Sequence, residues 1–323
     1  MAETMGAGGP PLRLAVLGAG PLGTASAALA ASRGHAVTLY SPRGGGTRNL
    51  GAGVTVAGLL AGSFPVRVSA DLGRALEGVD AVFVAVPGQA QTTLLERLAR
   101  VMTGAPGVLV APAASLSPLL LARLLKPRGV SAAVGGLVAP PVAARRLPDG
   151  RLWLGALRSR LWLGAEAEGP RLAALAEALF GIRVRQMEGM LAASLADMSG
   201  LGDAAQLLAP AGNPEAARRL LREFARERDA LAARFGLGLP DAALYFDEIG
   251  GLPPMEPERA LGQGGLALSF LVTLGVAGRV KVPMAEAALR MLEVFAGRGL
   301  RANPALLALG EDQVRAVLRR HAA

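Results

Sequence analysis

The residues that most clearly suggest chemistry lie near the N-terminus, in a glycine-rich motif. An apolar run, 14–17, leads into Gly18-Ala-Gly-Pro-Leu-Gly23, and an Ala-rich segment, 24–32, follows with the pattern of a helix. In such a motif the first glycine permits the turn from strand to helix, the second lets backbone approach a pyrophosphate, and the third lets the helix pack on the strand. The N–H groups that begin the helix attract phosphate.

We therefore expect a dinucleotide to bind at this motif. The alternative is a chance glycine turn in a chain that contains 43 glycines. The candidate cofactor-binding residues of the motif are Gly18, Gly20, Pro21, Leu22 and Gly23.

The segment after the second expected strand, 36–40, bears on which dinucleotide binds. An NAD site usually has Asp or Glu at this strand end to bind the ribose hydroxyls. Here Ser41 stands in that place, with Arg43 and Arg48 close behind. Small polar and cationic side chains suit the extra 2′-phosphate of NADP. The sequence favours NADP, with NAD as the second choice, unless the arginines are merely solvated loop residues.

A buried strand is expected at 81–86 and leads into Pro87. In a parallel sheet the carboxyl ends of the strands face the ligand, so this backbone would lie beside the nicotinamide half of the cofactor. We expect Val86, Pro87 and Gln91 to bind the cofactor, with Gln91 at the mouth of the cleft. The alternative is a core strand that simply ends at a proline.

Composition excludes several kinds of site. The chain has 323 residues, no cysteine and two histidines, so it has no thiolate nucleophile, disulfide or His cluster for a metal. The net charge is +9, but aromatic residues make up only 4 % and the basic residues are scattered. A nucleic-acid surface needs clustered basic residues with stacking aromatics. We expect no metal and no nucleic-acid partner.

The mean hydropathy of +0.40 calls for a search for membrane segments. The most apolar windows are 107–125, which contains two prolines, and 266–277, which is too short to span a bilayer. Residues 1–10 lack the basic start and apolar centre of a signal peptide and are expected to form a flexible leader. These observations predict a cytoplasmic protein without a membrane partner.

Short β-branched runs alternate with Ala/Leu-rich helical runs up to about residue 165, and several of these strands are apolar on both faces. This is typical of a parallel sheet covered by helices on each side. We expect an α/β fold: a Rossmann-type, doubly wound sheet in a dinucleotide-binding domain, 11–167. The expected strands are 12–17, 36–40, 66–69, 81–86, 108–111 and 131–134, with two edge strands within 150–164.

The rest of the chain, 168–323, has helical periodicity and is expected to form an all-helical substrate and dimerisation domain. Asn213-Pro-Glu215 has the residue types of a helix start. A nucleotide domain followed by a helical domain places the active site in the cleft between them. The expected helices are 189–208, 213–234, 259–274, 283–296 and 311–321.

Several longer motifs, in this order and spacing, resemble octopine/nopaline-type opine dehydrogenases. The resemblance implies the two-domain fold above, and an enzyme that uses NAD(P)H to reduce the imine formed between an amino acid and a 2-oxo acid. It also implies small-molecule substrates, and we expect a homodimer. The matching segments are 53–58, 71–82, 84–87, 140–145, 150–160, 259–266 and 275–288.

Two residues match the catalytic positions of that family only in part. Asp203 falls where the family has a catalytic His, and Arg259 keeps an arginine whose acidic partner is replaced by Gly264. We expect Asp203, if buried, to be the proton donor and Arg259 to bind a substrate carboxylate. Alternatively, Asp203 solvates a helix bend and Arg259 pairs with Glu256.

Two other functions fit the same fold. A 2-oxo or 3-hydroxy acid reductase similar to ketopantoate reductase would need a catalytic lysine in the helical domain, where only Lys281 is available. A protein that binds NADP without catalysis is the third reading, because the usual His and acid are missing.

Overall fold

The computed structural model describes residues 10–47, 50 and 53–321. The expected leader lies almost wholly outside these residues, and so does Arg48, one of the candidate cofactor-binding residues.

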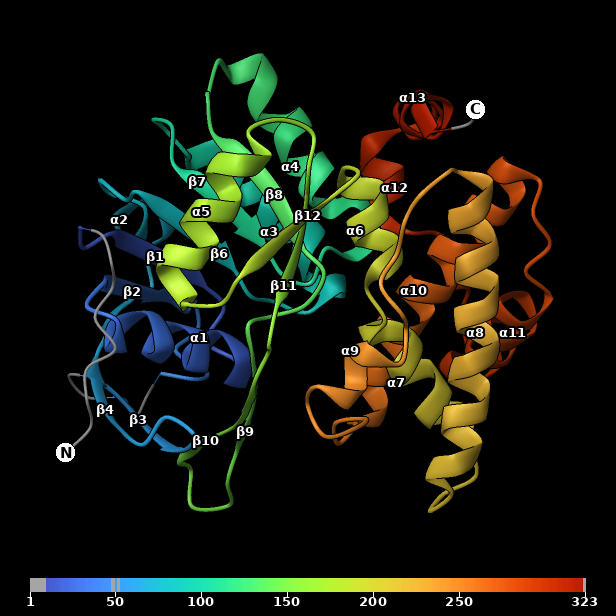
Figure 1. The fold of residues 1–323 in the computed structure, drawn as a ribbon, viewed down its shortest axis with the longest axis horizontal. Coiled ribbons are helices and arrows are strands. Elements are labelled where there is room, and N and C mark those ends of the chain that lie inside the picture. The colour runs from blue at the N-terminus through green and yellow to red at the C-terminus, as the bar shows by residue number, and fades with distance from the viewer. Residues whose placement is uncertain (1–9, 48–49, 51–52, 322–323) are drawn as a thin grey trace.

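The first part of the chain forms one large sheet with helices on both faces (Figure 1). All neighbouring strands are parallel except the antiparallel pair β8–β11. Alternate residues of the central strand pack to opposite sides, because both faces are covered: Leu14 and Val16 contact one apolar core, Ala15 and Leu17 the other. This confirms the Rossmann-type fold. In spatial order the strands are β12 (Val184–Met187), β11 (Leu161–Ala165), β8 (Ala133–Leu137), β7 (Gly107–Val110), β6 (Ala81–Val84), β1 (Arg13–Leu17), β2 (Ala36–Tyr40) and β5 (Arg67–Ser69).

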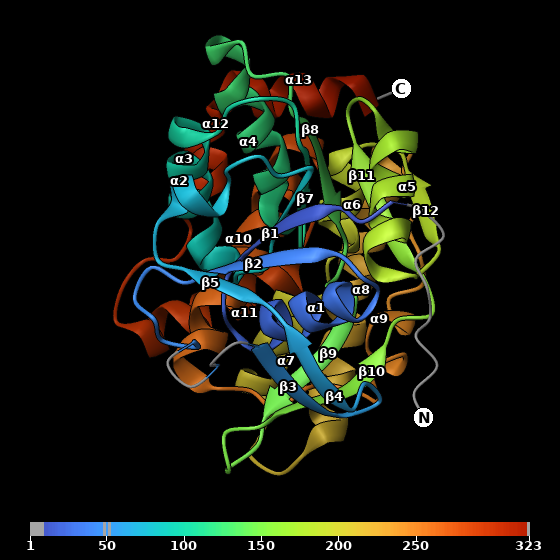
Figure 2. The same cartoon turned by 90° about the vertical axis from the view of Figure 1, so that its left-hand side faces the viewer.

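The helices that cover this sheet belong to two layers (Figure 2). One face carries α1 (Pro21–Ser32) and α5 (Gly169–Phe180). The other carries α3 (Gly88–Val101) and α4 (Ser117–Leu125), together with the short α2 (Leu72–Ala75).

A second, four-stranded sheet lies beside the first and was not expected from the sequence. Two of its strands, β3 and β10, bury alternate residues; in β10, Leu152 and Leu154 are buried while Trp153 is exposed. The edge strands expected within 150–164 therefore belong to different sheets. β11 lies inside the large sheet, and β10 lies in the small one. In spatial order the small sheet has β4 (Gly62–Pro65), β3 (Gly53–Gly58), β10 (Leu152–Leu157) and β9 (Val142–Arg146).

The large sheet continues past residue 167, where the first domain was expected to end. β12 pairs with β11, and the intervening helix α5 buries Leu172 and Leu179 against the sheet. The helical pattern of 169–180 thus belongs to a sheet-covering helix. The purely helical part begins with α6 (Met190–Ala196).

Three helices of the second part begin and end within one residue of their expected bounds. α8 (Pro214–Arg234) starts after Asn213, whose Oδ1 accepts from the Ala216 N–H at 2.9 Å. α11 (Pro283–Ala296) and α13 (Glu311–His321) also begin and end as expected. The others are α7 (Ser199–Leu208), α9 (Leu244–Asp247), α10 (Pro257–Gly278) and α12 (Pro304–Leu309).

The helix expected at 189–208 is broken in two. Asp197 has an extended backbone, and its Oδ1 accepts from the Ser199 N–H at 2.9 Å, which ends α6 and starts α7. Aspartate competes with helix formation in this way because its side chain satisfies a backbone N–H two residues on.

α10 is the one helix of the described residues that is long and apolar enough to cross a membrane by length and composition. It runs well beyond the apolar window 266–277. Its most apolar stretch is 61 % buried, and the helix packs against α7 and α11. A core helix of a globular protein has the same properties.

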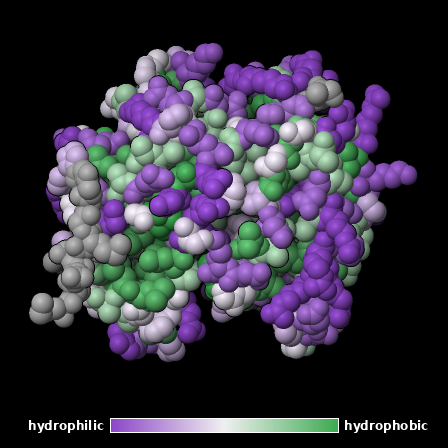
Figure 3. Space-filling model, in the orientation of Figure 1, coloured by the Kyte–Doolittle hydropathy of each residue, from purple (hydrophilic) through white to green (hydrophobic). Residues whose placement is uncertain are grey.

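Several ion pairs lie on exposed helix faces. On the face in Figure 3, hydrophilic residues cover the outer side of α8. There Glu215 lies within salt-bridge distance of Arg218 and Arg222. Such pairs describe a solvated helix surface.

Candidate functional site

The glycine-rich turn joins β1 to α1 with the geometry that its three glycines predict. Gly18 has φ +123°, and a Cβ there would lie 2.5 Å from the Ala85 carbonyl oxygen. A Cβ on Gly23 would lie 2.0 Å from the Gly18 carbonyl oxygen, so the helix packs directly on the strand end. Both positions therefore exclude any side chain.

Gly20 differs from its two neighbours in the motif. It caps α1 with an extended backbone, is exposed, and a Cβ there would meet no atom within 4 Å. The space above it is open to a ligand, and Pro21 and Leu22 start the helix beside it. This open position at a helix N-terminus fits a pyrophosphate, and thus a dinucleotide.

The loop after β2 lies against this turn. Ser41 is buried and its N–H donates to the Ser69 carbonyl, whereas Arg43 is exposed. Gly46 approaches so closely that a Cβ would lie 2.0 Å from the Ala19 carbonyl oxygen, and Arg146 donates to the Gly46 carbonyl at 2.8 Å. The loop is thus held where the ribose end of a dinucleotide would lie.

The carboxyl end of β6 also faces the turn. Val86 contacts the position of Gly18, and Pro87 caps α3. Gln91, in contrast, is not at the mouth of a cleft as expected. Its side chain is fully buried, and its Nε2 donates to the Val86 and Pro112 carbonyls at 3.2 and 2.8 Å.

The amide oxygen of Gln91 is also engaged, because it accepts from the Ser117 hydroxyl at 2.5 Å. Gln91 therefore shapes the strand ends from inside the protein. The residue nearer the second part is Gln89, whose side chain lies against Gly262 of α10.

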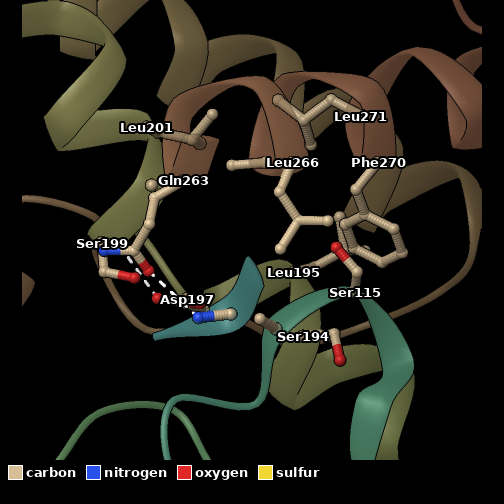
Figure 4. A pocket seen from close by; sticks show the side chains of 14 residues that line it. Ser115, Ser194, Leu195, Asp197, Ser199, Leu201, Gln263, Leu266, Phe270 and Leu271 are labelled. Carbon is tan, nitrogen blue, oxygen red and sulfur yellow. Dashed lines mark hydrogen bonds between the residues drawn. The ribbon is translucent and has the colours of Figure 1, made fainter. Parts of the chain in front are cut away.

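A small pocket lies where the two parts meet, next to the end of β6 (Figure 4). The first part contributes Gly88, Ala114 and Ser115, and the remaining residues come from the α6–α7 region and α10. The pocket is therefore continuous with the side of the sheet where the nicotinamide end of a dinucleotide would lie. From the second part it is lined by Ser194, Leu195, Asp197, Ser199, Gly200, Leu201, Gln263, Leu266, Ala267, Phe270 and Leu271.

Asp197 is the functional candidate that sequence reasoning missed. It lines the pocket at the break between α6 and α7, and its Oδ1 accepts from the Tyr245 hydroxyl at 3.1 Å as well as from the Ser199 N–H. Burial raises the pKa of the Asp197 carboxyl, while these hydrogen bonds act in the opposite direction. The pattern Asp-Met-Ser, with a hydroxyl residue two positions after an acid, was the available signal for a break.

Tyr245, which donates a hydrogen bond to Asp197, is itself buried and held by neighbouring side chains. The pKa of the Tyr245 hydroxyl is raised by burial and by the Asp197 charge, so the phenol stays protonated. The buried Arg158 guanidinium lies 4.7 Å from the Tyr245 ring centre and pairs with Glu248 at 3.2 Å. Glu248 thus has a structural role as the partner of Arg158 and Ser159.

Asp203 lies one turn beyond Ser199 on α7, on the same side of the helix. Its Oδ2 accepts from the Gln263 Nε2 at 3.1 Å, and the Gln263 Oε1 accepts from the Gly88 N–H at 3.1 Å. Burial raises the pKa of Asp203 to about 6, the Arg259 charge lowers it, and the Asp197 charge raises it. The burial that a proton-donating role requires is present.

Arg259 lies one turn before Gln263 on α10 and is exposed. Within the described part of the chain it has no ion pair within 4 Å, with Glu256 or any other acid, although it is close enough to Asp203 to affect its pKa. The structure thus brings Asp203 and Arg259 together beside the end of β6.

Two serines of the pocket are held by a buried polar network that the sequence did not reveal. Ser115 has φ +49° and Leu116 φ +61°, a left-handed conformation that is costly for residues with a side chain. Asn303 Nδ2 donates to the Ser115 hydroxyl at 3.0 Å, and the Leu116 N–H donates to the Ser194 hydroxyl at 3.0 Å. Asn303 precedes Pro304 and caps α12. The sequence signal for this residue was the pair Asn-Pro, which is typical of a helix start.

Comparison with known families matches the first part of the chain. The sequence model described as NAD-dependent glycerol-3-phosphate dehydrogenase N-terminus matches residues 13–112. A curated glycerol-3-phosphate dehydrogenase [NAD(P)+] of Geobacillus thermodenitrificans is 39 % identical over 108 residues. That match spans 32 % of this chain and 31 % of the relative, less than a third of either protein.

Solved structures match nearly the whole chain. An octopine dehydrogenase in complex with NADH and agmatine has a TM-score of 0.69 at 17 % identity, covering 96 % of this chain and 95 % of that one. A yersinopine dehydrogenase with NADP+ bound has a TM-score of 0.67 at 17 % identity, covering 96 % and 98 %. A ketopantoate reductase from Ralstonia eutropha has a TM-score of 0.64 at 19 % identity, covering 88 % and 99 %.

The expected likeness to opine dehydrogenases is thus confirmed at the level of the fold. The chain has the two-part fold that octopine dehydrogenase and ketopantoate reductase share, with a first segment similar to the N-terminal part of NAD-dependent glycerol-3-phosphate dehydrogenases.

Proposed function

We propose that this protein is an NADP(H)-dependent oxidoreductase of the opine dehydrogenase type, which reduces the imine formed between an amino acid and a 2-oxo acid. One observation carries the proposal. The hydrogen bonds Gly88–Gln263–Asp203 connect the end of β6, beside the glycine-rich turn, to a half-buried carboxyl group. A proton donor and a dinucleotide site are therefore adjacent.

The bound cofactor would supply a hydride, and the chain's own residues would do the rest. Asp203 holds a proton at its carboxyl group and delivers it to the substrate nitrogen, because its raised pKa keeps a useful fraction protonated near neutrality. Arg259 binds the carboxylate of the 2-oxo acid through its free guanidinium. Gln263 fixes the orientation of the Asp203 carboxyl.

The bound molecules of the structural relatives support this choice. Octopine dehydrogenase has been solved with NADH and L-arginine, with NADH and agmatine, and with NADH and pyruvate, and yersinopine dehydrogenase with NADP+. An amine and a 2-oxo acid are thus ligands of proteins with this fold.

The ketopantoate reductase-like function is less well supported, although the fold fits it equally. Its lysine would have to be Lys281, which is exposed in the turn after α10. Along that helix, Gln263 lies about 22 Å from Gly278, the last helical residue before the turn, at 1.5 Å per residue. A lysine at that distance cannot reach a substrate beside Gly88.

The reaction is tested by following NADPH oxidation with pairs of amino acids and 2-oxo acids, and separately with 2-oxo acids alone. We expect oxidation only when both an amine and a 2-oxo acid are present. Oxidation with a 2-oxo acid alone would favour the hydroxyacid reductase. Tight NADPH binding with no turnover of any pair would favour the non-catalytic protein.

The cofactor preference is tested at the loop after β2. We expect NADPH to bind more tightly than NADH in calorimetric titrations, because Arg43 and Arg48 lie in the chain segment that would meet the 2′-phosphate. Replacing both by Ala should remove most of the difference, whereas Arg219→Ala, on the exposed face of α8, should leave it unchanged. Equal affinities in the unmodified protein would contradict NADP preference.

We also propose that the protein is a homodimer in the cytoplasm. A cluster of exposed apolar side chains on α11, Met291, Val294 and Phe295, offers a surface for a second copy. Light scattering after size-exclusion chromatography tests the dimer, with Val294→Lys expected to give a monomer. Cell fractionation tests the location.

A further inference from the structure

A buried asparagine joins the two parts of the molecule next to the candidate site. Asn303 stands before Pro304, is 3 % exposed, and uses both ends of its amide. Its Oδ1 accepts from the Leu306 N–H at 3.3 Å and so caps α12. Its Nδ2 donates to the Ser115 hydroxyl at 3.0 Å and to the Leu266 carbonyl at 3.1 Å. One side chain therefore binds the turn after β7, the middle of α10 and the start of α12.

The turn that Asn303 binds has a strained backbone. Ser115 and the next residue, Leu116, have φ +49° and +61°, the left-handed region that is costly for residues with a side chain. Such a conformation persists only where the surrounding contacts require it. Here they are the Asn303 hydrogen bond, the bond from the Leu116 N–H to the Ser194 hydroxyl at 3.0 Å, and the full burial of Leu116. The shape of this turn therefore depends on residues from the second part of the chain.

The turn and α10 both pack against Gly88, the residue after the end of β6 that starts α3. A Cβ on Gly88 would lie 2.8 Å from Leu266 Cδ2 and 2.9 Å from the Ala114 Cβ, so both neighbours touch its backbone. The Gly88 N–H also donates to Gln263, which in turn donates to Asp203. Leu266 follows Gln263 by three residues, about 4.5 Å along the helix at 1.5 Å per residue. A shift of α10 at Leu266 would therefore move the Gly88–Gln263–Asp203 chain as well.

A helix cap alone does not require this arrangement. Asn213 stands before Pro214 in the same way and caps α8 through its Oδ1, but it is exposed. Within the part of the chain that the structure describes, its amide nitrogen donates to no residue. The feature that distinguishes Asn303 is thus the donor half of its amide, which joins the turn to α10.

We propose that Asn303 is a positioning residue: it fixes the turn at Ser115 relative to α10, so that the Gly88–Gln263–Asp203 chain stays in place beside the cofactor. Because Asn303 is buried, it acts through Ser115 and Leu266. The inference rests on the proposed function for the identity of the reaction, whereas the mobility of the turn and the helix can be measured without it.

The variant Asn303→Ser separates the bridge from the cap. Serine still caps a helix, but it is too short to reach Ser115 and Leu266. We expect kcat for NADPH oxidation, with an amino acid and a 2-oxo acid, to fall at least about tenfold, since small misplacements of reacting groups are costly. The KM for NADPH should stay the same, because the glycine-rich turn is untouched. Asn213→Ser, the same change at the other Asn-Pro cap, is the matched control and should alter neither constant.

Two further measurements would not respond to a purely structural role. Burial is the main cause that raises the pKa of Asp203 to about 6, and a displaced α10 would admit water to this carboxyl. Activity of Asn303→Ser should therefore be lost at a lower pH than activity of the unmodified protein. Ser115→Ala removes the acceptor of the same bond, so the double variant should be no slower than the slower single variant.

Hydrogen exchange followed by mass spectrometry tests the positions without turnover. The amides of 113–117 and 263–269 should exchange faster in Asn303→Ser than in the unmodified protein, and at the normal rate in Asn213→Ser.

The outcomes separate the two proposals. Faster exchange in Asn303→Ser, with no turnover of any substrate pair by the unmodified protein, would support the positioning of these segments and overturn the proposed reaction. An unchanged kcat and pH profile in Asn303→Ser of an active protein would overturn the positioning role and leave the reaction standing. If Asn303→Ser does not fold, Ser115→Ala decides, because an unchanged kcat in that variant would also overturn the role.

Discussion

Asp203 and Asp197 are two neighbouring carboxyl groups with different hydrogen-bond partners and different nearby charges. Asp203 is hydrogen-bonded to an amide and lies near the Arg259 guanidinium, whereas Asp197 accepts from the Tyr245 hydroxyl and is close enough to Arg158 for that charge to lower its pKa. The Asp197 charge raises the pKa of Asp203, as expected for neighbouring acids. At the scale of single residues, Asp203 is the proposed proton donor, and Asp197 is the neighbouring acid that helps to keep its pKa high.

Asp203→Asn is expected to lower turnover about 100-fold or more and to leave the affinity for NADPH unchanged, because it removes the proton but not the amide contact to Gln263. The unmodified enzyme should lose imine-reducing activity as the pH rises above about 6, where Asp203 deprotonates. Stopped-flow NADPH oxidation measures both effects, with the exposed Asp312→Asn as control. Survival of turnover would make Asp203 structural.

Asp203→Asn should also change how the free energy of unfolding depends on pH. The pKa of Asp203 is about 6 in the folded protein and 3.8 for the unperturbed group, so the folded state binds more protons between these values. Stability contributed by the protonated carboxyl is therefore lost as the pH rises through this window. Asp203→Asn should match the unmodified protein below about pH 4 and be more stable above about pH 7, by at most about 3 kcal/mol at roughly 1.4 kcal/mol per pKa unit.

Urea unfolding at pH 4 and at pH 8 measures this difference. An equal effect at both pH values would show that Asp203 has an ordinary pKa, and the proton-donor role would then be lost with it.

At the scale of elements, two glycines of the β1–α1 turn have different roles: Gly20 is expected to serve cofactor binding and Gly23 to serve folding. Gly20→Ala places a methyl group in open space with an acceptable backbone, so its melting temperature should be unchanged while NADPH affinity falls at least about tenfold. Gly23→Ala drives a Cβ to 2.0 Å from backbone and should destabilise the protein by several kcal/mol, despite the better helix propensity of Ala.

Thermal melts and NADPH titrations of the two variants provide the comparison. Loss of stability in Gly20→Ala, or normal stability in Gly23→Ala, would contradict the roles given to these glycines.

The elements best predicted from sequence were those with local signals. α8 was recognised from Asn213-Pro-Glu215, and β2 from an apolar run between turn residues. The small sheet was missed because its strands come from distant segments, 53–65 and 142–157, and each buries at most two of its residues. The helix break at Asp197 was missed because the apolar period continues through it.

The candidate site was likewise predicted best where the signal is local in the sequence. The glycine-rich turn was predicted well, because a motif of six consecutive residues carries its own geometry. Gln91 was misplaced, because sequence spacing shows how far a residue lies from a strand end but not whether its side chain points inward. Asn303 was missed, since its hydrogen bond to Ser115 joins residues 188 positions apart.

At the scale of the whole molecule, one apolar core extends through both parts. It contains Leu17 and Leu95 from the sheet side together with Phe224 and Leu268 from the helices. We therefore expect a single cooperative unfolding transition. Both tryptophans lie on strands, and most of the helix signal comes from the second part, so fluorescence and circular dichroism report different regions.

The two signals should give coincident urea curves with one midpoint. Separate midpoints would show that the parts unfold independently. In that case residues 10–188, which include the strand β12, should fold when expressed alone.

The loop that follows β2 limits how cofactor use in this protein can be redesigned. Gly46 touches the Ala19 carbonyl, and Arg146 of the small sheet binds the Gly46 carbonyl from the other side. Any side chain at position 46 would push the loop away from the phosphate turn. A library that aims to exchange the two nicotinamide coenzymes can therefore vary position 43 freely, but it must keep glycine at 46 and arginine at 146.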